Sequence, residues 1–246
     1  MNPINNCKAM IFAAGFGTRL KPFTDHHPKA LAPVNGKSLL QRNIEYLSSF
    51  GISNIVVNIH HFADQVLEEL KRLSTDHLKF SISHEKDGPF ETGGGLAFAA
   101  QYLDHGDDPF IVMNVDMLTN LDLLGMFDYH QKINPLATLA VTDRKSSRQF
   151  LFDEEMKLVG WKNNLTAQVK WVDGEVDEVK PFSFSGIHII HPSIFKYMPE
   201  AGTFSIVDVY LNIAKEKLII AYDHTGDLIL DVGKPESLVK AEEVFK

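Results

Sequence analysis

The chain has 246 residues, 44% of them hydrophobic and 23% charged, which is the composition of an ordinary globular protein and suits one large domain. A net charge of −8, spread without long blocks, argues against a nucleic acid or an anionic membrane surface as partner. Cys7 is the only cysteine and no apolar stretch approaches membrane-spanning length, so we expect a protein of the reducing cytoplasm without an internal disulfide.

The first predicted element is the apolar run at 9–13, which is short enough for a buried parallel strand. It ends in the small-residue loop A-G-F-G at 14–17, where backbone N–H groups can approach a ligand closely. Arg19 and Lys29 follow this loop, and bare amides combined with two cations suit a polyphosphate. The alternative is a glycine turn with two solvated cations.

Two familiar phosphate-binding motifs do not fit this region. The dinucleotide fingerprint requires a glycine where Leu20 stands, and Pro22 is incompatible with the helix that should follow it. The segment G-K-S at 36–38 ends like a Walker A loop, but the first glycine of such a loop would fall at Leu31. We therefore expect a phosphate-binding loop of another kind.

Strands and helices then alternate to about residue 143 at the spacing of βαβ units. Ser38 begins the first helix with a capping box, and Gly51 follows its end. Apolar spacing predicts further helices around 66–73 and over 121–131, and strands over 54–59, 78–83, 109–113 and 136–141. This alternation predicts a mostly parallel sheet with helices on both faces and ligands at the carboxyl ends of its strands.

The alternation of strands and helices ends at about residue 143. Segments 149–152 and 158–161 are typical of short antiparallel strands, and the polar segment 170–181 of a surface loop or hairpin. We then expect a strand over 182–190, a helix from Ser205 to about 217, strands over 218–222 and 227–232, and a closing helix from Pro235. The whole chain, 1–246, is predicted to form one domain with an inserted smaller lobe.

Two carboxylates each follow an apolar run. Asp116 comes after the strand at 109–113, which places it opposite the glycine loop, where it can hold Mg²⁺ against phosphates. Asp231 comes after a late strand in the same way. If these strands are neighbours in one sheet, the two carboxylates lie close together and need a cation between them. For Asp116 alone, a turn-forming aspartate is an equal alternative.

The segment E-T-G-G-G at 91–95 precedes an alanine-rich stretch. Its glycines allow a base or ribose to lie directly on the backbone, with Thr92 as the helix cap and Glu91 meeting the nucleotide. A flexible loop at the entry to a helix is the alternative. His84-Glu85, at the end of the preceding strand, is placed to read a base edge by hydrogen bonding, and Ser185-Gly186 interrupts a strand where a sugar can approach the backbone.

The pattern G-x-G-T-R-L-x-P-x-T-x-x-x-P-K, from Gly15 to Lys29, resembles the signature of the sugar-1-phosphate nucleotidyltransferases, or NDP-sugar pyrophosphorylases. The resemblance covers most of 7–120 and returns at 182–238. It implies an α/β, three-layer, Rossmann-like nucleotidyltransferase fold with a mostly parallel central sheet and a smaller antiparallel substrate lobe. Residues from about 7 to 143 would form the nucleotide-binding half and those from about 144 to 246 the sugar-binding lobe.

The resemblance also implies roles for individual residues. Arg19 would stabilise the departing pyrophosphate, Lys29 would act near the α-phosphate, and Asp116 with Asp231 would hold Mg²⁺. The nucleotide-binding set is Ala13, Ala14, Gly15, Gly17, Thr18, His84, Glu91, Gly94 and Gly95, and the set for the sugar phosphate is Asn114, Lys180, Ser185 and Gly186. Two departures stand out: Leu230 replaces the usual aromatic before Asp231, and Lys180 lies only six residues before Gly186.

The implied substrates are a nucleoside triphosphate and a sugar 1-phosphate. The E-T-G-G-G form most resembles the small single-domain members of the family, notably the N-acetylmuramate-1-phosphate uridylyltransferases, which predicts UTP. A mannose-1-phosphate guanylyltransferase, a phosphocholine cytidylyltransferase and a non-catalytic nucleotide-sugar sensor remain open. The joint presence of Arg19, Lys29, Asp116 and Asp231 argues against the sensor, which would not need all four.

Overall fold

The strand expected at 9–13 lies at the centre of the sheet as β1 (Lys8–Phe12). It pairs in parallel with β4 (Asn54–Ile59) on one side and with β6 (Phe110–Asn114) on the other. β5 (Lys79–His84) extends this parallel set beyond β4. Because parallel strands end at the same edge of a sheet, the segments that follow these four strands gather in one place.

Antiparallel strands extend the sheet on its other side. β12 (Lys180–Ile190) runs antiparallel to β6 and connects the parallel set with β8 (Ala137–Thr142) and β9 (Arg148–Phe152). The outer strands are β10 (Leu158–Asn163), β11 (Gln168–Trp171) and β13 (Ile219–Asp223). Two small sheets stand apart, β2 (Pro33–Val34) with β3 (Lys37–Ser38) and β7 (Met117–Thr119) with β14 (Ile229–Asp231).

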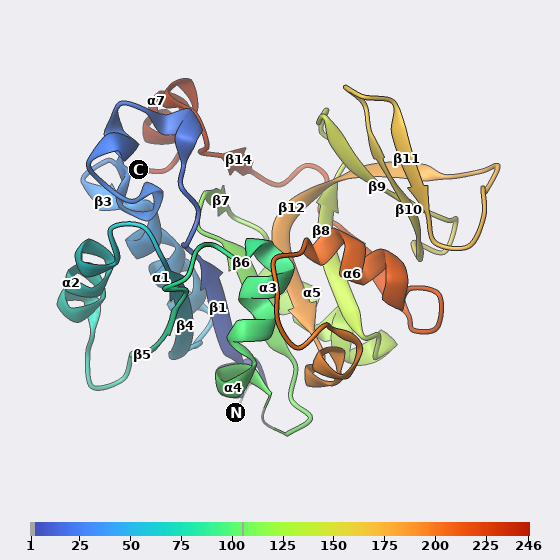
Figure 1. Ribbon diagram of the computed structural model, residues 1–246, viewed down its shortest axis with the longest axis horizontal. Helices are drawn as coiled ribbons and strands as arrows, with labels where there is room; N and C mark the ends of the chain where they lie inside the picture. Colours follow the sequence, from blue (N-terminus) through green and yellow to red (C-terminus); the bar gives the residue numbers. More distant parts are fainter. Residues whose placement is uncertain (1–2, 105) are drawn as a thin grey trace.

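The computed structural model describes residues 3–104 and 106–246, and helices cover both faces of its sheet (Figure 1). One face carries α1 (Leu39–Ser49), α2 (Ala63–Leu73), α5 (Leu123–Ile133) and α7 (Pro235–Val244), and the other α3 (Glu91–Phe98), α4 (Ala100–Leu103) and α6 (Ile206–Ile213). The short 3-10 helices are η1 (Pro3–Asn6), η2 (Thr18–Leu20), η3 (Phe23–Asp25), η4 (Lys29–Leu31) and η5 (Pro192–Tyr197). Successive strand residues face opposite cores, Met10 one and Ile11 the other, which confirms the three-layer fold.

Local signals placed most elements correctly. Ser38 caps α1 by accepting a hydrogen bond from the Gln41 backbone N–H at 3.0 Å, and Gly51 follows the helix with φ +86°. Two boundaries differ from their predictions. The loop expected over 170–181 covers only 172–179, because β11 reaches Trp171 and β12 begins at Lys180; α6 ends at Ile213 and not near residue 217.

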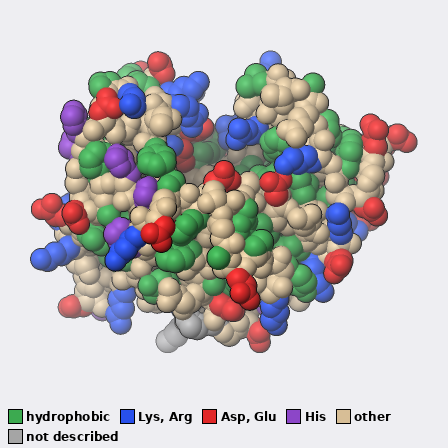
Figure 2. All heavy atoms as spheres, viewed as in Figure 1, with side chains coloured by type: hydrophobic (Ala, Val, Ile, Leu, Met, Phe, Trp, Pro, Cys, Tyr) green, Lys and Arg blue, Asp and Glu red, His purple; other side chains and the backbone are tan. Residues whose placement is uncertain are grey.

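The lobe formed by β9, β10 and β11 stands away from the parallel part of the sheet (Figure 1). Figure 2 shows the surface hollowed between this lobe and the N-terminal half, with basic side chains on both walls. The hollow lies at the edge where the parallel strands end, as the sequence predicted for the ligand site. Within the described residues, no helix is long and apolar enough to cross a membrane.

Candidate active site

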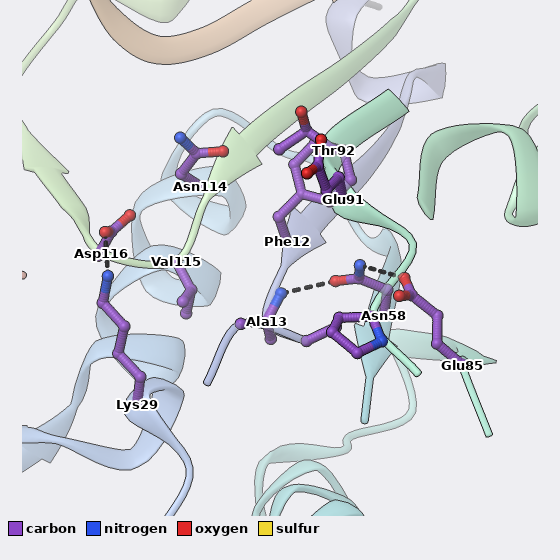
Figure 3. A pocket seen from close by; sticks show the side chains of 13 residues that line it. Phe12, Ala13, Lys29, Asn58, Glu85, Glu91, Thr92, Asn114, Val115 and Asp116 are labelled. Carbon is purple, nitrogen blue, oxygen red and sulfur yellow. Dashed lines mark hydrogen bonds and ion pairs between the residues drawn. The ribbon is translucent and has the colours of Figure 1, made fainter. Parts of the chain in front are cut away.

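A cavity of about 210 Å³ lies at the end of β1, against the glycine loop (Figure 3). The Ala13 backbone N–H donates to Asn58 Oδ1 at 2.6 Å, and Asn58 Nδ2 donates to Glu85 Oε1 at 2.7 Å. Glu85 Oε2 in turn accepts from the Phe90 backbone N–H at 2.8 Å. This buried chain of hydrogen bonds joins the ends of β1, β4 and β5 to the segment before α3, so it fixes the shape of the cavity.

Asn58 was not predicted from the sequence, and Glu85 was expected, with His84, only to read a base edge; both are almost fully buried and line this cavity. The signal for Asn58 is a polar residue inside the apolar run V-V-N-I at 56–59. A buried amide in such a strand must find hydrogen-bond partners, so its position marks a polar site nearby.

Gly15 and Gly17, the two glycines of the loop, are required for different structural reasons. Gly15 lines the cavity, and a Cβ added there would meet nothing within 4 Å. Gly17 has φ +61°, and a Cβ there would lie 2.7 Å from Lys29 Cβ. Thr24 Oγ1 donates to the Gly17 carbonyl at 3.0 Å and holds this turn. Gly17 and Thr18 were predicted to bind the nucleotide, but they do not line this cavity. Gly17 instead permits the loop to pack against Lys29.

Asp116 lines both this cavity and a larger one of about 670 Å³, and Lys29 meets it from the side of the smaller cavity. The Lys29 ammonium forms an ion pair with the Asp116 carboxylate, and the two side chains are only 13% and 17% exposed. Asn114 and Thr92 also line both cavities. The larger cavity is the hollow below the lobe, so the two spaces form one continuous site.

Gly186, where a sugar was predicted to approach the backbone, lies on the wall of the larger cavity. Its φ is +74°, and a Cβ would lie 2.9 Å from Asn114 Nδ2 and 2.7 Å from Met117 Cγ. Only glycine fits this close approach between β12 and the end of β6.

Asp231 approaches Asp116 by a route that the sequence did not predict. It lies on β14, which pairs with β7 in a separate small sheet and not in the central one. The Val232 backbone N–H donates to the Asp116 carbonyl at 2.8 Å, so the two main chains are adjacent. Both side chains line the larger cavity, and Asp231 Oδ1 lies 3.9 Å from Arg19 Nη2.

These two carboxylates fit a hard divalent cation. Asp231 Oδ1 is buried and has no hydrogen-bond partner, which leaves an oxygen free for a metal ligand bond. Across the described residues, no cluster of three or more His, Cys, Asp or Glu side chains could hold a metal. A cation held by Asp116 and Asp231 would therefore need further oxygens from a bound ligand, which is the usual setting for Mg²⁺ beside phosphates.

The E-T-G-G-G segment differs from its prediction. Its glycines lie inside α3, whose N-cap is Phe90, and Thr92 Oγ1 accepts from the Ile206 backbone N–H at 3.2 Å instead of capping the helix. A Cβ on Gly94 would lie 2.1 Å from the Gly202 carbonyl oxygen. Gly94 and Gly95 therefore serve close packing behind the cavity, whereas Glu91 and Thr92 line it.

Three other predicted residues do not reach the site. Lys180 Nζ donates to the Glu154 carbonyl at 3.4 Å, on the exposed side of the lobe. Ser185 is buried, and its hydroxyl hydrogen-bonds to His224 Nε2 at 2.7 Å. His84 ends β5 but lines neither cavity. The structure thus brings together the phosphate-loop and carboxylate residues, but not the predicted lysine for the sugar phosphate.

Arg144 occupies the larger cavity where a cation for the sugar phosphate was expected. It lies between β8 and β9, and its Nη2 donates to the Phe184 carbonyl at 2.9 Å. Burial lowers the pKa of Arg144, and the nearby Asp231 carboxylate opposes that shift. No sequence motif marked this residue.

Comparison with protein families matches residues 8–150 to the nucleotidyl transferase family. The chain belongs to this family. It is 29% identical over 242 residues to the N-acetylmuramate alpha-1-phosphate uridylyltransferase of Caulobacter vibrioides, covering 95% of both proteins. It is 27% identical over 240 residues to the mannose-1-phosphate guanylyltransferase catalytic subunit beta of Drosophila pseudoobscura pseudoobscura, covering 96% of this chain.

This nucleotidyl transferase spans 61% of the length of that guanylyltransferase subunit. Its fold also matches the solved structure of a UDP-glucose pyrophosphorylase complexed with UDP-glucose, with a TM-score of 0.76 and 22% identity over 97% of this chain and 98% of the other. That likeness confirms the nucleotidyltransferase fold expected from the sequence. The relatives differ in both nucleobase and sugar.

Proposed function

We propose that this nucleotidyl transferase joins the nucleoside monophosphate of a nucleoside triphosphate, with UTP preferred, to a sugar 1-phosphate. An oxygen of the sugar phosphate attacks the α-phosphorus, the bond to the bridging oxygen breaks, and pyrophosphate leaves. The observation that carries the proposal is the junction of two cavities at Lys29 and Asp116, with the glycine loop on one side and Gly186 on the other. The smaller cavity suits the nucleotide and the larger one the sugar.

The chain's own residues position the reactants and neutralise charge. The backbone of Ala13, Ala14 and Gly15 would bind phosphate oxygens, and Arg19 would stabilise the charge that develops on the leaving pyrophosphate. Lys29 would bind near the α-phosphate. Its ammonium contacts Asp116 in the structure, so a bound phosphate would replace that carboxylate as its partner.

Asp116 and Asp231 would hold Mg²⁺, which supplies positive charge beside the phosphates when bound. Lys29 and Arg19 lie beside these carboxylates, and when both cations turn to bound phosphates, the carboxylate oxygens become available to the metal. Asn114 and Gly186, on the wall of the larger cavity, would contact the sugar phosphate.

The preference for UTP rests on the E-T-G-G-G segment and on the uridylyltransferase relative, which this chain matches over 95% of both lengths. Glu91 and Thr92 are the residues of that segment placed to contact the nucleoside. Guanylyl transfer to mannose 1-phosphate is the second candidate, because a relative of that name is nearly as similar.

A pyrophosphate-release assay tests the proposal by crossing four nucleoside triphosphates with a panel of sugar 1-phosphates. We expect turnover that requires both substrates and is fastest with UTP. A preference for GTP of tenfold or more, about 1.4 kcal/mol, would refute the uridylyl assignment and favour the guanylyl one. Absence of pyrophosphate release with every pair would refute the transferase.

A further inference from the structure

The larger cavity contains positive charge that the roles proposed above leave unused. Arg144, in the β8–β9 connection, and Arg148, the first residue of β9, both line it. Neither guanidinium forms an ion pair with a carboxylate in the part of the chain that the structure describes. Arg148 is exposed and Arg144 half-buried, so two guanidiniums without a carboxylate partner in one cavity favour an anionic ligand there.

Arg144 marks the end of the cavity that lies next to the reaction centre. Its Nη2 is occupied by the Phe184 carbonyl at 2.9 Å, but its Nε is buried without a hydrogen-bond partner. Its electrostatic neighbour is Asp231, the carboxylate proposed to hold Mg²⁺. A phosphate in the cavity would accept hydrogen bonds from the remaining Nη N–H groups and lie near Asp231, so Arg144 is placed to bind the 1-phosphate in place of the expected Lys180.

Arg148 belongs to a different part of the wall. It pairs with Asn163 across β9 and β10, so it lies on the lobe, whereas Arg144 contacts β12. Its backbone N–H donates to Ser146 Oγ at 3.3 Å, which holds the turn that leads into β9. The side chains of Ser146 and Asn163 line the same wall and offer neutral hydrogen-bonding groups to sugar hydroxyls.

We propose that the preferred sugar 1-phosphate carries a second anionic group, which Arg148 binds while Arg144 holds the 1-phosphate. This inference rests on the proposed function and specifies its sugar. A guanidinium binds a carboxylate or phosphate through two parallel hydrogen bonds, which neutral sugars cannot provide. With a neutral sugar, Arg148 would be covered by the ligand without an anionic partner, which disfavours binding.

The test compares substrates that differ in one group, with UTP as donor or whichever nucleotide gives turnover. Glucose 1-phosphate is compared with glucuronic acid 1-phosphate, which has a carboxylate at C6, and with glucose 1,6-bisphosphate, which has a phosphate there. N-acetylglucosamine 1-phosphate is compared with N-acetylmuramate 1-phosphate, which carries a carboxylate in the lactyl ether at position 3. We expect kcat/KM at least about tenfold higher for an anionic member than for its neutral partner, and the arms distinguish carboxylate from phosphate and C6 from C3.

Variants assign the preference to one residue. Arg148→Gln should bring the ratio of kcat/KM between the anionic and neutral partners to within about threefold, whereas Arg148→Lys should retain part of the preference. Arg144→Gln should lower kcat/KM for all sugar phosphates alike. Lys162→Gln is the matched control, because Lys162 lies on β10 between two residues that line the cavity and faces the other side.

A wild-type protein that turns over only neutral sugars, or prefers the neutral member of every pair, overturns the inference but leaves the transferase standing. An anionic preference that survives Arg148→Gln also overturns it, since another residue then reads the group. If no sugar phosphate is turned over with any nucleotide, the proposed function itself fails and the inference fails with it.

Discussion

The two glycines of the phosphate loop should respond differently to alanine, because only one of them packs against the protein. In Gly17→Ala the new methyl group would lie 2.7 Å from Lys29 Cβ at a backbone φ of +61°. A left-handed conformation costs an L-residue about 1–2 kcal/mol, and overpacking adds about 1–3 kcal/mol, so we expect a loss of roughly 2–5 kcal/mol. For a chain of this size, that loss lowers Tm by roughly 4–20 °C.

Gly17→Ala should also lower activity, because relieving the overlap moves Lys29 away from its position. A misplacement of about 1 Å in a catalytic group costs about 10²-fold in rate. Gly15→Ala is the matched control: its methyl group meets no protein atom within 4 Å, so its free energy of unfolding should stay within about 1 kcal/mol of wild type. Since Gly15 lines the nucleotide cavity, that methyl group should instead raise KM for the nucleoside triphosphate.

Thermal denaturation and steady-state kinetics on the two variants separate these effects. The reasoning is refuted for Gly17 if the Tm of Gly17→Ala lies within about 2 °C of the wild-type Tm, because a loss of 1 kcal/mol would already lower Tm by about that much. It is refuted for Gly15 if Gly15→Ala keeps the wild-type KM for the nucleotide, because its backbone then does not face the phosphates.

Arg19→Ala and Lys29→Ala should each lower kcat/KM by about 10²–10³, since each removes a charge-assisted contact made mainly in the transition state; a variant that keeps more than about a third of the activity contradicts its assigned role. Asp116→Asn and Asp231→Asn should each abolish most Mg²⁺-dependent turnover. In urea denaturation, the free energy of unfolding should fall by about 1–3 kcal/mol for Asp116→Asn, because the 13% exposed Lys29 loses its partner, and by less than about 1 kcal/mol for Asp231→Asn. Equal losses in the two variants would contradict the assigned ion pairs. Burial lowers the pKa of His130 from 6.5 to about 4, so protonation favours the unfolded chain, and His130 should contribute about 1.4 kcal/mol per unit to the fall in stability as pH drops from 6.5 towards 4. His130→Asn should reduce the slope by that amount without abolishing it, because burial also lowers the pKa of His188, to about 3; an unchanged slope would show that His130 does not contribute.

The sequence predicted those elements whose signals are local. Ser38 and Gly51 bound α1 through their own hydrogen bonds and backbone conformation, so their chemistry is visible without the rest of the fold. The G-G-G run at 93–95 is the contrary case. Three consecutive glycines disfavour a helix by about 1 kcal/mol each, which predicts a loop.

α3 nevertheless includes that run, because the glycines have no side chains and the helix backbone can therefore contact the segment 202–204 directly. The backbone N–H groups of Gly93 and Gly94 both donate to the Phe204 carbonyl, and a Cβ on Gly94 would overlap the Gly202 carbonyl oxygen. The partners lie more than a hundred positions away in the chain. No pattern within the segment could have identified them, so tertiary packing decides the conformation against local propensity.

Lys180 shows a limit of transferring a motif by residue type. It lies on the same strand as Gly186, six residues before it. At about 3.3 Å per residue, an unbroken strand separates the two by about 20 Å, too far for both to contact one phosphate. Arg144 contacts β12 at Phe184 instead, two residues before Gly186, and supplies a cation from a connection between strands that carries no recognisable pattern.

The two halves of the site differ in how far the sequence could predict them, and the reason is how each is built. The phosphate half comes from one continuous loop after β1. Its backbone amides and two cations lie within about twenty residues of each other, so they form a motif that can be recognised in the sequence. The sugar half is a wall to which β6, the β8–β9 connection, β9, β10 and β12 each contribute one to three residues. A change of one wall residue, such as Arg148, can alter the sugar without touching the loop. Because the loop and the wall can change separately, two relatives can be about equally similar to this chain and still be named for different sugars. The identity of the sugar must therefore be inferred from the wall residues and not from the loop motif.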